Sequence, residues 1–196
     1  MYALFEGVDT SGKTTQIELL KSTFPEILAT KEPAGTEFGV WAREILLGGK
    51  LHSKEAEALL FLADRAEHYE RVVKPNRERK LVISDRGFIS GIAYALANGS
   101  GDFEKLFELN RFALGGEMPD LVLFFEIDEA TLKARLGAKA QDAIEKRGLE
   151  YILRVQSEIK SAVQRLNIPH KILDATKSID EINREICEIL SLKERS

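Results

Sequence analysis

Four residues near the start of the chain have the types and the spacing that bind phosphate. The pattern G-x-x-x-x-G-K-[ST] is matched without exception by Gly7, Gly12, Lys13 and Thr14. Glycines let the backbone wind around an oxyanion, and the free N–H groups and dipole of a following helix favour negative charge. In this pattern the lysine reaches the β- and γ-phosphates and the threonine hydroxyl ligates Mg²⁺. An ordinary glycine-rich turn is disfavoured because an apolar run precedes the loop and a helical pattern follows it, so we expect a site for a nucleoside triphosphate.

A second candidate group follows another apolar run, within LVISDRGFISGIAY. P-loop enzymes hold a carboxylate near the metal directly after a strand, at the sheet edge where their ligands bind. We therefore expect Asp85 on the metal side. If a helix follows, Arg86, Ser90 and Tyr94 share one of its faces at a spacing of four residues, and the arginine fork suits a phosphate. A solvated helix face is the plainer alternative.

A third pair, Phe61 and Arg65, lies four residues apart in LLFLADR. A helix would present both side chains on one face. There a base can stack on the ring while the guanidinium bonds the edge of the base or a phosphate. Phenylalanine in so apolar a segment is more often part of the core, and that alternative stays open. The neighbouring arginine is what favours a binding role.

These groups must be positioned by alternating strands and helices. Short apolar runs predict strands over Tyr2–Phe5, Ile27–Thr30, Leu81–Ser84, Leu121–Ile127 and His170–Leu173. Helical spacing predicts helices over Lys13–Ser22, Glu37–Leu47, Ser53–Lys74, Phe88–Asn98, Asp102–Leu114, Gly148–Leu166 and Ser178–Leu192. Consecutive apolar residues, as in LVIS and LVLFFEI, are typical of parallel strands covered on both faces. The sequence therefore predicts a three-layer α/β/α sandwich with a five-stranded parallel sheet, the P-loop NTPase fold.

Length and composition narrow the class of protein. A chain of 196 residues, 44% hydrophobic and 31% charged, suits one domain with an ordinary core. A net charge of −4 gives no basic field for a nucleic acid polymer, and no apolar run approaches the roughly 18 residues of a membrane span. The single cysteine, Cys187, can form neither an internal disulfide nor a four-ligand zinc site. We expect a cytoplasmic protein that acts on a small molecule.

One stretch, RLGAKAQDAIEKRG, is charged and rich in small residues between better-patterned segments. We interpret residues 135–148 as a mobile lid within a single domain of residues 1–196, because such surface segments often carry function. A plain solvated helix is the alternative.

Five motifs taken together resemble the bacterial thymidylate kinases, a family of P-loop nucleoside monophosphate kinases. They are FEGVDTSGKTT, KEPAGT, LLFLADR, SDRGFISGIAY and DAIEKRGLEYILRV, and their order and spacing match along nearly the whole chain. None of the four later motifs is specific to this family by itself, but the ordered set is. The resemblance implies transfer of the γ-phosphoryl group of ATP to dTMP, giving dTDP and ADP, with Mg²⁺ as cofactor and a homodimer as the assembly.

The resemblance also implies roles for individual residues. Phe61 would stack on thymine, Arg65 would read the base, and Arg86 would hold the acceptor phosphate. Tyr94 would crowd the 2′ position of the sugar, and Asp9 would serve the ribose or the metal. The other implied contacts are Glu32 and Ser90 with dTMP, Arg135 with adenine, and Gly7, Val8, Asp9, Thr10, Ser11, Gly12, Lys13, Thr14 and Thr15 with ATP.

Four positions depart from the family pattern. The family's REPGGT loop is KEPAGT here, with Lys31 for arginine and Ala34 for glycine, so the charge survives without its bidentate fork. Gly91 stands where the family usually has one of two polar residues that touch the base. Ala143 stands where the family has a lid arginine that closes over the transferring phosphate. We hypothesise that Lys139 acts from the lid in its place.

The expected reaction needs no strong general base. The attacking oxygen belongs to a phosphate whose second pKa is about 6, so it is mostly dianionic at neutral pH, and positioning with charge neutralisation suffices. None of His52, His68 and His170 stands in a recognisable catalytic constellation. Two alternatives remain: a kinase for another nucleoside monophosphate, and a GTPase-type nucleotide-gated module, although the chain has no N-K-x-D guanine-binding motif.

Overall fold

The computed structural model describes residues 1–49, 51–137 and 148–192. At its centre is a five-stranded parallel sheet with the strand order β2-β3-β1-β4-β5. The strands are β1 (Tyr2–Glu6), β2 (Leu28–Lys31), β3 (Val82–Asp85), β4 (Leu121–Glu126) and β5 (His170–Asp174). All five strands expected from the sequence are confirmed, with slightly shifted ends.

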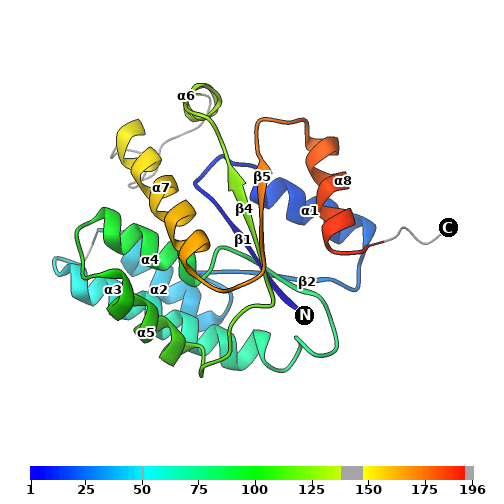
Figure 1. Cartoon of the computed structure of the whole chain (residues 1–196). Coiled ribbons are helices and arrows are strands. Elements are labelled where there is room, and N and C mark those ends of the chain that lie inside the picture. Colours follow the sequence, from blue (N-terminus) through cyan, green and yellow to red (C-terminus); the bar gives the residue numbers. More distant parts are fainter. Residues whose placement is uncertain (50, 138–147, 193–196) are drawn as a thin grey trace.

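Helices lie on both sides of this sheet, so the expected three-layer sandwich is confirmed (Figure 1). On one side α1 (Lys13–Thr23) packs against α8 (Ile179–Ile189), and on the other α4 (Phe88–Ala97) packs against α7 (Leu149–Arg165). The remaining helices are α2 (Glu37–Leu47), α3 (Lys54–His68) with its π-helical continuation η1 (Tyr69–Val73), α5 (Phe103–Ala113) and α6 (Glu129–Leu136). None of the helices in the described ranges is long and apolar enough to cross a membrane.

The apolar core is densest at the central strands, which are covered on both faces. Every residue of β1 is buried, and Phe5 packs on Phe125 beside it with ring centroids 5.3 Å apart. The edge strands differ. β2 is half-buried, and only Leu173 is buried in β5. Runs of consecutive apolar residues are therefore required only at the centre of the sheet.

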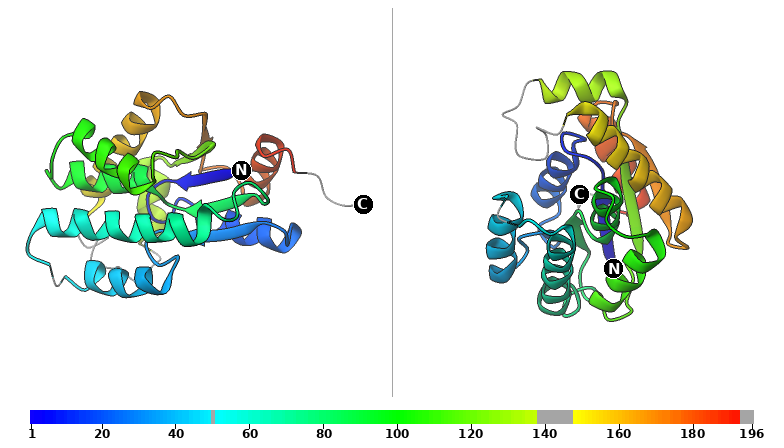
Figure 2. Two further views of the ribbon diagram at one scale, coloured as in Figure 1. Left: turned by 90° about the horizontal axis from the view of Figure 1, so that it is seen from below. Right: turned by 90° about the vertical axis from the view of Figure 1, so that its left-hand side faces the viewer.

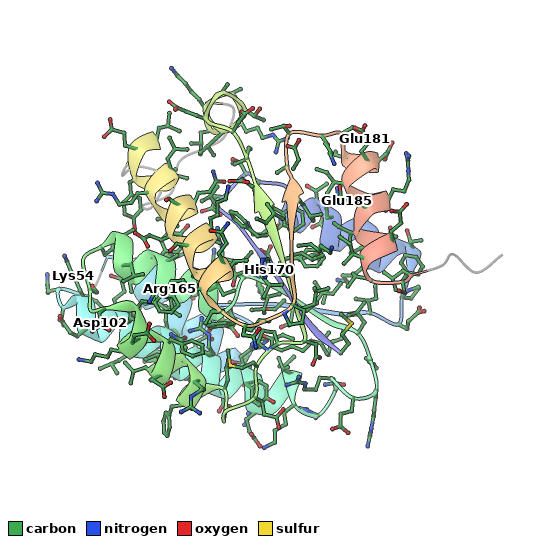
Figure 3. The ribbon with its side chains drawn as sticks, viewed as in Figure 1. Lys54, Asp102, Arg165, His170, Glu181 and Glu185 are labelled. Carbon is green, nitrogen blue, oxygen red and sulfur yellow. The ribbon has the colours of Figure 1, made fainter. Side chains whose placement is uncertain are left out.

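Helices α2 and α3 run side by side (Figure 2), and α3 also contacts α4 and α5. Arg165, at the end of α7, joins that helix to α5 (Figure 3). Its guanidinium carbon lies 3.9 Å from the ring centroid of Phe103, and its Nη2 pairs with Glu104 at 2.6 Å. Through α4 and α5, helix α3 is held against the sandwich.

Helix α6 is the element that the sequence analysis missed. Asp128 caps it by accepting a hydrogen bond from the N–H of Thr131 at 2.7 Å. The stretch interpreted as a lid therefore begins inside a helix, since Arg135 belongs to α6. The rest of that stretch, residues 138–147 with Lys139 and Ala143, lies outside the described residues.

The carboxyl ends of β1 and β3 meet at one edge of the sheet, because Phe5 pairs with Asp85 in the register. The phosphate-binding loop follows β1, and Arg86 follows β3. From β1 the chain goes to β2 on one side of the sheet and later to β4 on the other. Open parallel sheets bind their ligands at such a reversal of strand order.

Candidate active site

The phosphate-binding loop covers residues 7–12, between β1 and α1. Gly12 has a φ of +95°, and a Cβ at Gly7 would lie 2.9 Å from the carbonyl oxygen of Phe125, so both positions need glycine. Gly12 also gives α1 no side-chain cap. The first N–H groups of that helix are therefore left to bind an anion.

Lys13 is the first residue of α1, and its side chain folds back onto this loop. Its Nζ donates to the carbonyl oxygen of Val8 at 2.9 Å and to Oγ of Ser11 at 3.4 Å, and only 4% of the residue is exposed. Burial, with a further contribution from the Arg86 guanidinium, lowers the pKa of Lys13 to about 8. An incoming phosphate would stabilise the charged ammonium and raise this pKa again.

Thr14 and Asp85, the candidate Mg²⁺ ligands, line the same cleft. Thr14 Oγ1 donates to Asp85 Oδ2 at 2.7 Å. Their oxygens suit Mg²⁺, which proteins usually hold with one or two carboxylates together with substrate phosphates. Across the described residues, no group of three His, Cys, Asp or Glu side chains could hold a metal by itself. The residues present therefore fit a cation that is bound jointly with a nucleotide.

Arg86 connects the phosphate-binding loop to the helix that follows β3. Its Nη1 donates to the carbonyl oxygen of Gly7 at 2.7 Å, and its Nη2 donates to Asp9 Oδ1 at 2.7 Å. The guanidinium carbon lies 5.6 Å from the centroid of the Tyr94 ring. Burial alone would lower the pKa of Arg86, but Tyr94, Asp9 and Asp85 raise it above its ordinary value. A permanent cation therefore lies beside the loop.

Ser90 lines a second cleft together with Arg86 and Tyr94, and its hydroxyl is engaged with a buried carboxylate. Glu6 accepts hydrogen bonds from both the hydroxyl and the backbone N–H of Ser90. Burial raises the pKa of Glu6. The Ser90 hydroxyl in turn accepts from Arg86 at 3.3 Å, so it links Arg86 to Glu6 and has one acceptor lone pair left for a ligand. Glu6 was not predicted from the sequence, because its partner lies 84 residues away.

Phe61 and Arg65 also line this second cleft, from α3. Arg65 is 2% exposed, and its Nε donates to Glu32 Oε2 at 2.8 Å. The other oxygen of Glu32 lies 2.9 Å from His68 Nδ1. Burial alone would raise the pKa of Glu32, but Arg65 and His68 lower it below its ordinary value. Glu32 therefore holds Arg65 in place, and His68 is a buried structural residue.

Two clefts meet at this edge of the sheet. The first, at the phosphate-binding loop, contains Thr10, Gly12, Lys13, Thr14, Thr15 and Asp85. The second contains Phe61, Arg65, Ser90, Gly91 and Tyr94. Both are lined by Asp9, Glu32, Pro33, Arg43 and Arg86. Lys13 and Arg86 thus line the same cleft.

Arg43 is a residue of both clefts that the sequence analysis did not single out. It lies on α2, is exposed, and lines both clefts. In the sequence, Arg43 cannot be distinguished from an ordinary charged residue on the exposed face of a helix. No local pattern distinguishes it, so only the fold reveals it.

Arg135 reaches the phosphate-binding loop from α6. Its Nη1 donates to the carbonyl oxygen of Thr10 at 3.1 Å, and its Nη2 donates to the carbonyl oxygen of Ala175 at 3.0 Å. The guanidinium therefore bridges the loop and the segment after β5. A flat cation in this position is suited to pack against an aromatic base.

A parallel α/β sandwich with a phosphate-binding loop at its reversal point defines a P-loop nucleotide-binding protein, here with a second cleft for another ligand. The family model for thymidylate kinase matches residues 5–186. The chain belongs to the thymidylate kinase family, as its motifs predict.

Individual relatives agree along nearly the whole chain. Thymidylate kinases of Sulfurovum sp. (strain NBC37-1) and Campylobacter concisus (strain 13826) are 57% and 51% identical, over 98% of this chain and 100% of each relative. The crystal structure of thymidylate kinase from Ehrlichia chaffeensis matches with a TM-score of 0.76 at 25% identity. That match covers 97% of this chain and 98% of the other.

Proposed function

We propose that this chain transfers the γ-phosphoryl group of ATP to dTMP, giving dTDP and ADP. The observation that carries this proposal is the pair of clefts that share Asp9, Arg43 and Arg86. The donor cleft has the phosphate-binding loop, and the acceptor cleft has an aromatic ring beside a guanidinium. A triphosphate and a monophosphate could therefore meet phosphate to phosphate. Membership of the thymidylate kinase family supports dTMP as the acceptor.

On the donor side, the free N–H groups of the loop and of the first turn of α1 would bind the phosphates of ATP. Lys13 would span the β- and γ-phosphates, and Arg135 would stack on adenine. Thr14 and Asp85 would hold Mg²⁺, which neutralises charge on the β- and γ-oxygens. The hydrogen bond between Thr14 and Asp85 supports that assignment.

On the acceptor side, the fork of Arg86 would hold the phosphate of dTMP. Phe61 would stack on the base and Arg65 would bond its edge. Tyr94, whose ring faces the Arg86 guanidinium, would crowd the 2′ position and favour deoxyribose. Asp9 pairs with Arg86 at 2.7 Å, which supports a role in orienting that arginine beside its role at the ribose or the metal.

In the transfer, a phosphate oxygen of dTMP attacks the γ-phosphorus while the bond to the β–γ bridging oxygen breaks and ADP leaves. Negative charge spreads over the transferring group and must be met by cations in place beforehand. Lys13 and Arg86 would supply two of these, and Arg43 and Lys139 are candidates for a further one. Exclusion of water from the site would prevent hydrolysis of ATP.

A coupled assay of ADP release tests this function, using ATP and a panel of dTMP, dUMP, dCMP, dGMP and AMP. We expect dTMP to have the highest kcat/KM. Another preferred monophosphate would favour a kinase for a different acceptor. ATP or GTP hydrolysis that no monophosphate accelerates would instead favour a nucleotide-gated module.

We further propose that the protein is a cytoplasmic homodimer. Val40 and Trp41 on α2 and Leu59 on α3 each expose about half or more of their surface, and the two helices pack side by side. Exposed apolar side chains of this kind suit burial against a second copy. Light scattering during size-exclusion chromatography should give twice the 22.0 kDa of one chain. A mass of one chain would contradict the dimer.

A further inference from the structure

The guanidinium of Arg65 is held along two of its edges. Its Nε donates to Glu32 Oε2 at 2.8 Å, and its Nη1 donates to Oδ1 of Asn110 on α5. All three residues are almost completely buried. Arg65 also lines the acceptor cleft, so this arrangement decides which edge of the guanidinium a ligand can meet.

The side-chain amide of Asn110 has a fixed orientation. Its Nδ2 donates to the backbone carbonyl oxygen of Leu106, one turn earlier in α5, at 2.7 Å. Its Oδ1 must therefore face Arg65 as an acceptor. Asn110 brings no charge, and Glu32 already balances the charge of Arg65, so the amide contributes direction without adding a second carboxylate.

The guanidinium packs closely against Gly91 and also borders open space. A Cβ at Gly91 of α4 would lie 3.1 Å from both Nη1 and Nη2, so the absence of a side chain there gives the guanidinium its place. A cavity of about 30 Å³, room for about one water molecule, borders Arg65, Gly91 and Asn110. With open space beside it, the guanidinium depends on its hydrogen bonds for its orientation.

The Nη2 edge of the guanidinium remains available to a ligand. Within residues 1–49, 51–137 and 148–192, Nη2 of Arg65 has no hydrogen-bond partner. A guanidinium can only donate. It therefore accepts a base that presents a carbonyl oxygen and rejects one that presents an amino group, because two donors would then face each other.

We propose that Asn110 is a positioning residue for base selection: it turns Arg65 so that the Nη2 edge faces the acceptor base, favouring a pyrimidine with an oxo group over one with an amino group at the same position. This inference rests on the proposed function, with Arg65 beside the base. Asn110 itself touches no substrate. Gly91 on α4 has no side chain to contact the base. In this chain the oriented Arg65 therefore makes the base contact that a polar side chain at that position would make.

The test compares wild type with Asn110→Leu, which keeps the size but loses the acceptor, and Asn110→Asp, which keeps the acceptor. Steady-state kcat and KM are measured for dTMP and dCMP. For Asn110→Leu we expect KM for dTMP to rise about tenfold with kcat within twofold, and the preference for dTMP over dCMP to fall about tenfold. Asn110→Asp keeps an acceptor beside Arg65 but loses the donor to the Leu106 carbonyl oxygen, so it should keep more of the preference than Asn110→Leu.

A matched control separates positioning from stability. Gln156 is another buried amide, bonded through both ends to the backbone of Ile127. Gln156→Met should lower the melting temperature and leave the preference for dTMP unchanged. If Asn110→Leu does not fold, Asn110→Ser serves instead, since its hydroxyl can bond the Leu106 carbonyl and preserve α5 while it is too short to reach Arg65.

The outcomes are distinct. A folded Asn110→Leu or Asn110→Ser variant with wild-type KM and wild-type preference would overturn the inference and leave the proposed function standing. An equal loss of preference in Gln156→Met would also overturn it, by showing a general effect of stability. A wild-type chain that phosphorylates no dTMP would overturn the proposed function, and this inference with it.

Discussion

The donor cleft and the acceptor cleft are built in different ways. The donor cleft takes most of its phosphate-binding groups from the main chain of consecutive residues, in loop 7–12 and the first turn of α1. The acceptor cleft takes side chains from α3, α4 and the loop after β2, and these meet only in the folded chain. A short sequence pattern can specify the first kind of site, whereas the second needs the whole fold.

The two clefts also balance their charges differently. In the donor cleft, Lys13 is bonded to neutral oxygens and burial lowers its pKa to about 8, so its charge is available to a phosphate. In the acceptor cleft, Arg65 is already paired with Glu32, so it contributes direction more than net charge. The donor cleft should therefore be sensitive to loss of charge, and the acceptor cleft to loss of geometry.

The largest effect is expected at Lys13. Lys13→Ala removes the ammonium buried in the loop, and we expect kcat to fall about 10³-fold, as when a preorganised stabilising group is removed. Lys21→Ala, exposed on the same helix, should keep the wild-type rate. The coupled ADP assay measures both. A Lys13→Ala variant with more than a tenth of the wild-type kcat would mean that the main-chain N–H groups suffice.

Asp64 gives the next largest effect, on stability. It precedes Arg65 on α3, and its buried Oδ1 has no hydrogen-bond partner within the part of the chain that the structure describes. Burial, and then the nearby Glu32 carboxylate, raise the pKa of Asp64 to about 6. Because this pKa is higher in the folded than in the unfolded state, stability is lost as the pH rises from about 4 to about 6.

Asp64→Asn cannot ionise. Relative to wild type, we expect its free energy of unfolding to increase between pH 4 and pH 6, by up to about 3 kcal/mol, and then to level off. Urea unfolding followed by circular dichroism from pH 4 to pH 8 measures this difference. Glu67→Gln, on the same helix, is the control. A difference that does not change with pH would contradict the raised pKa of the buried Asp64 carboxyl group.

Arg43 and Lys139 are the two candidates for the positive charge at the transferring phosphate that Ala143 cannot supply. Because Arg43 lines both clefts but is exposed and screened by solvent, we expect Arg43→Ala to lower kcat about tenfold. Arg184→Ala, on the exposed side of α8, should change nothing. If Lys139 acts on the transferring group, Lys139→Ala should lower kcat far more than the affinity for dTMP. Unchanged kcat in a variant removes that residue from the mechanism.

The smallest effect is expected at Ala34, in the loop after β2 that borders both clefts. Its φ of +88° strains a residue with a Cβ, and glycine relieves that strain. We expect Ala34→Gly to raise the free energy of unfolding by up to about 1 kcal/mol. The control, Ala134→Gly in exposed α6, should lower it by about 1 kcal/mol. Urea unfolding measures both variants. A change in the free energy of unfolding in the same direction for both would contradict backbone strain at Ala34.

The donor cleft could be predicted from the sequence because its structure is local. Gly7 is needed for a close backbone approach and Gly12 for a positive φ, and Lys13 bonds to oxygens of the same loop. The strand before the loop and the helix after it have clear apolar patterns. Helix α6 escaped because it is short and follows β4 almost directly. Asp128 before Glu129 was an available signal, since an acidic cap and an acidic first turn favour a helix start.

The acceptor cleft was predicted only in part. Phe61, Arg65 and Arg86 were found by their spacing, and Asp9 and Glu32 were named through the family resemblance. Glu6 and Asn110 were not found. Glu6 and Asn110 act on partners that lie 84 and 45 residues away, and a local pattern carries no such information. The one available signal was the position of Asn110 on the buried stripe of α5, where a polar side chain needs a partner.

The most direct test of the central claim, that the two clefts face each other across shared cations, is the affinity of a single molecule that fills both. Adenosine and thymidine joined through five phosphates would be titrated calorimetrically against the chain, beside ATP and dTMP alone. If the clefts meet as described, the second half binds intramolecularly, and the joined molecule should bind at least about 10²-fold more tightly than either nucleotide. Binding no tighter than that of ATP would contradict the account.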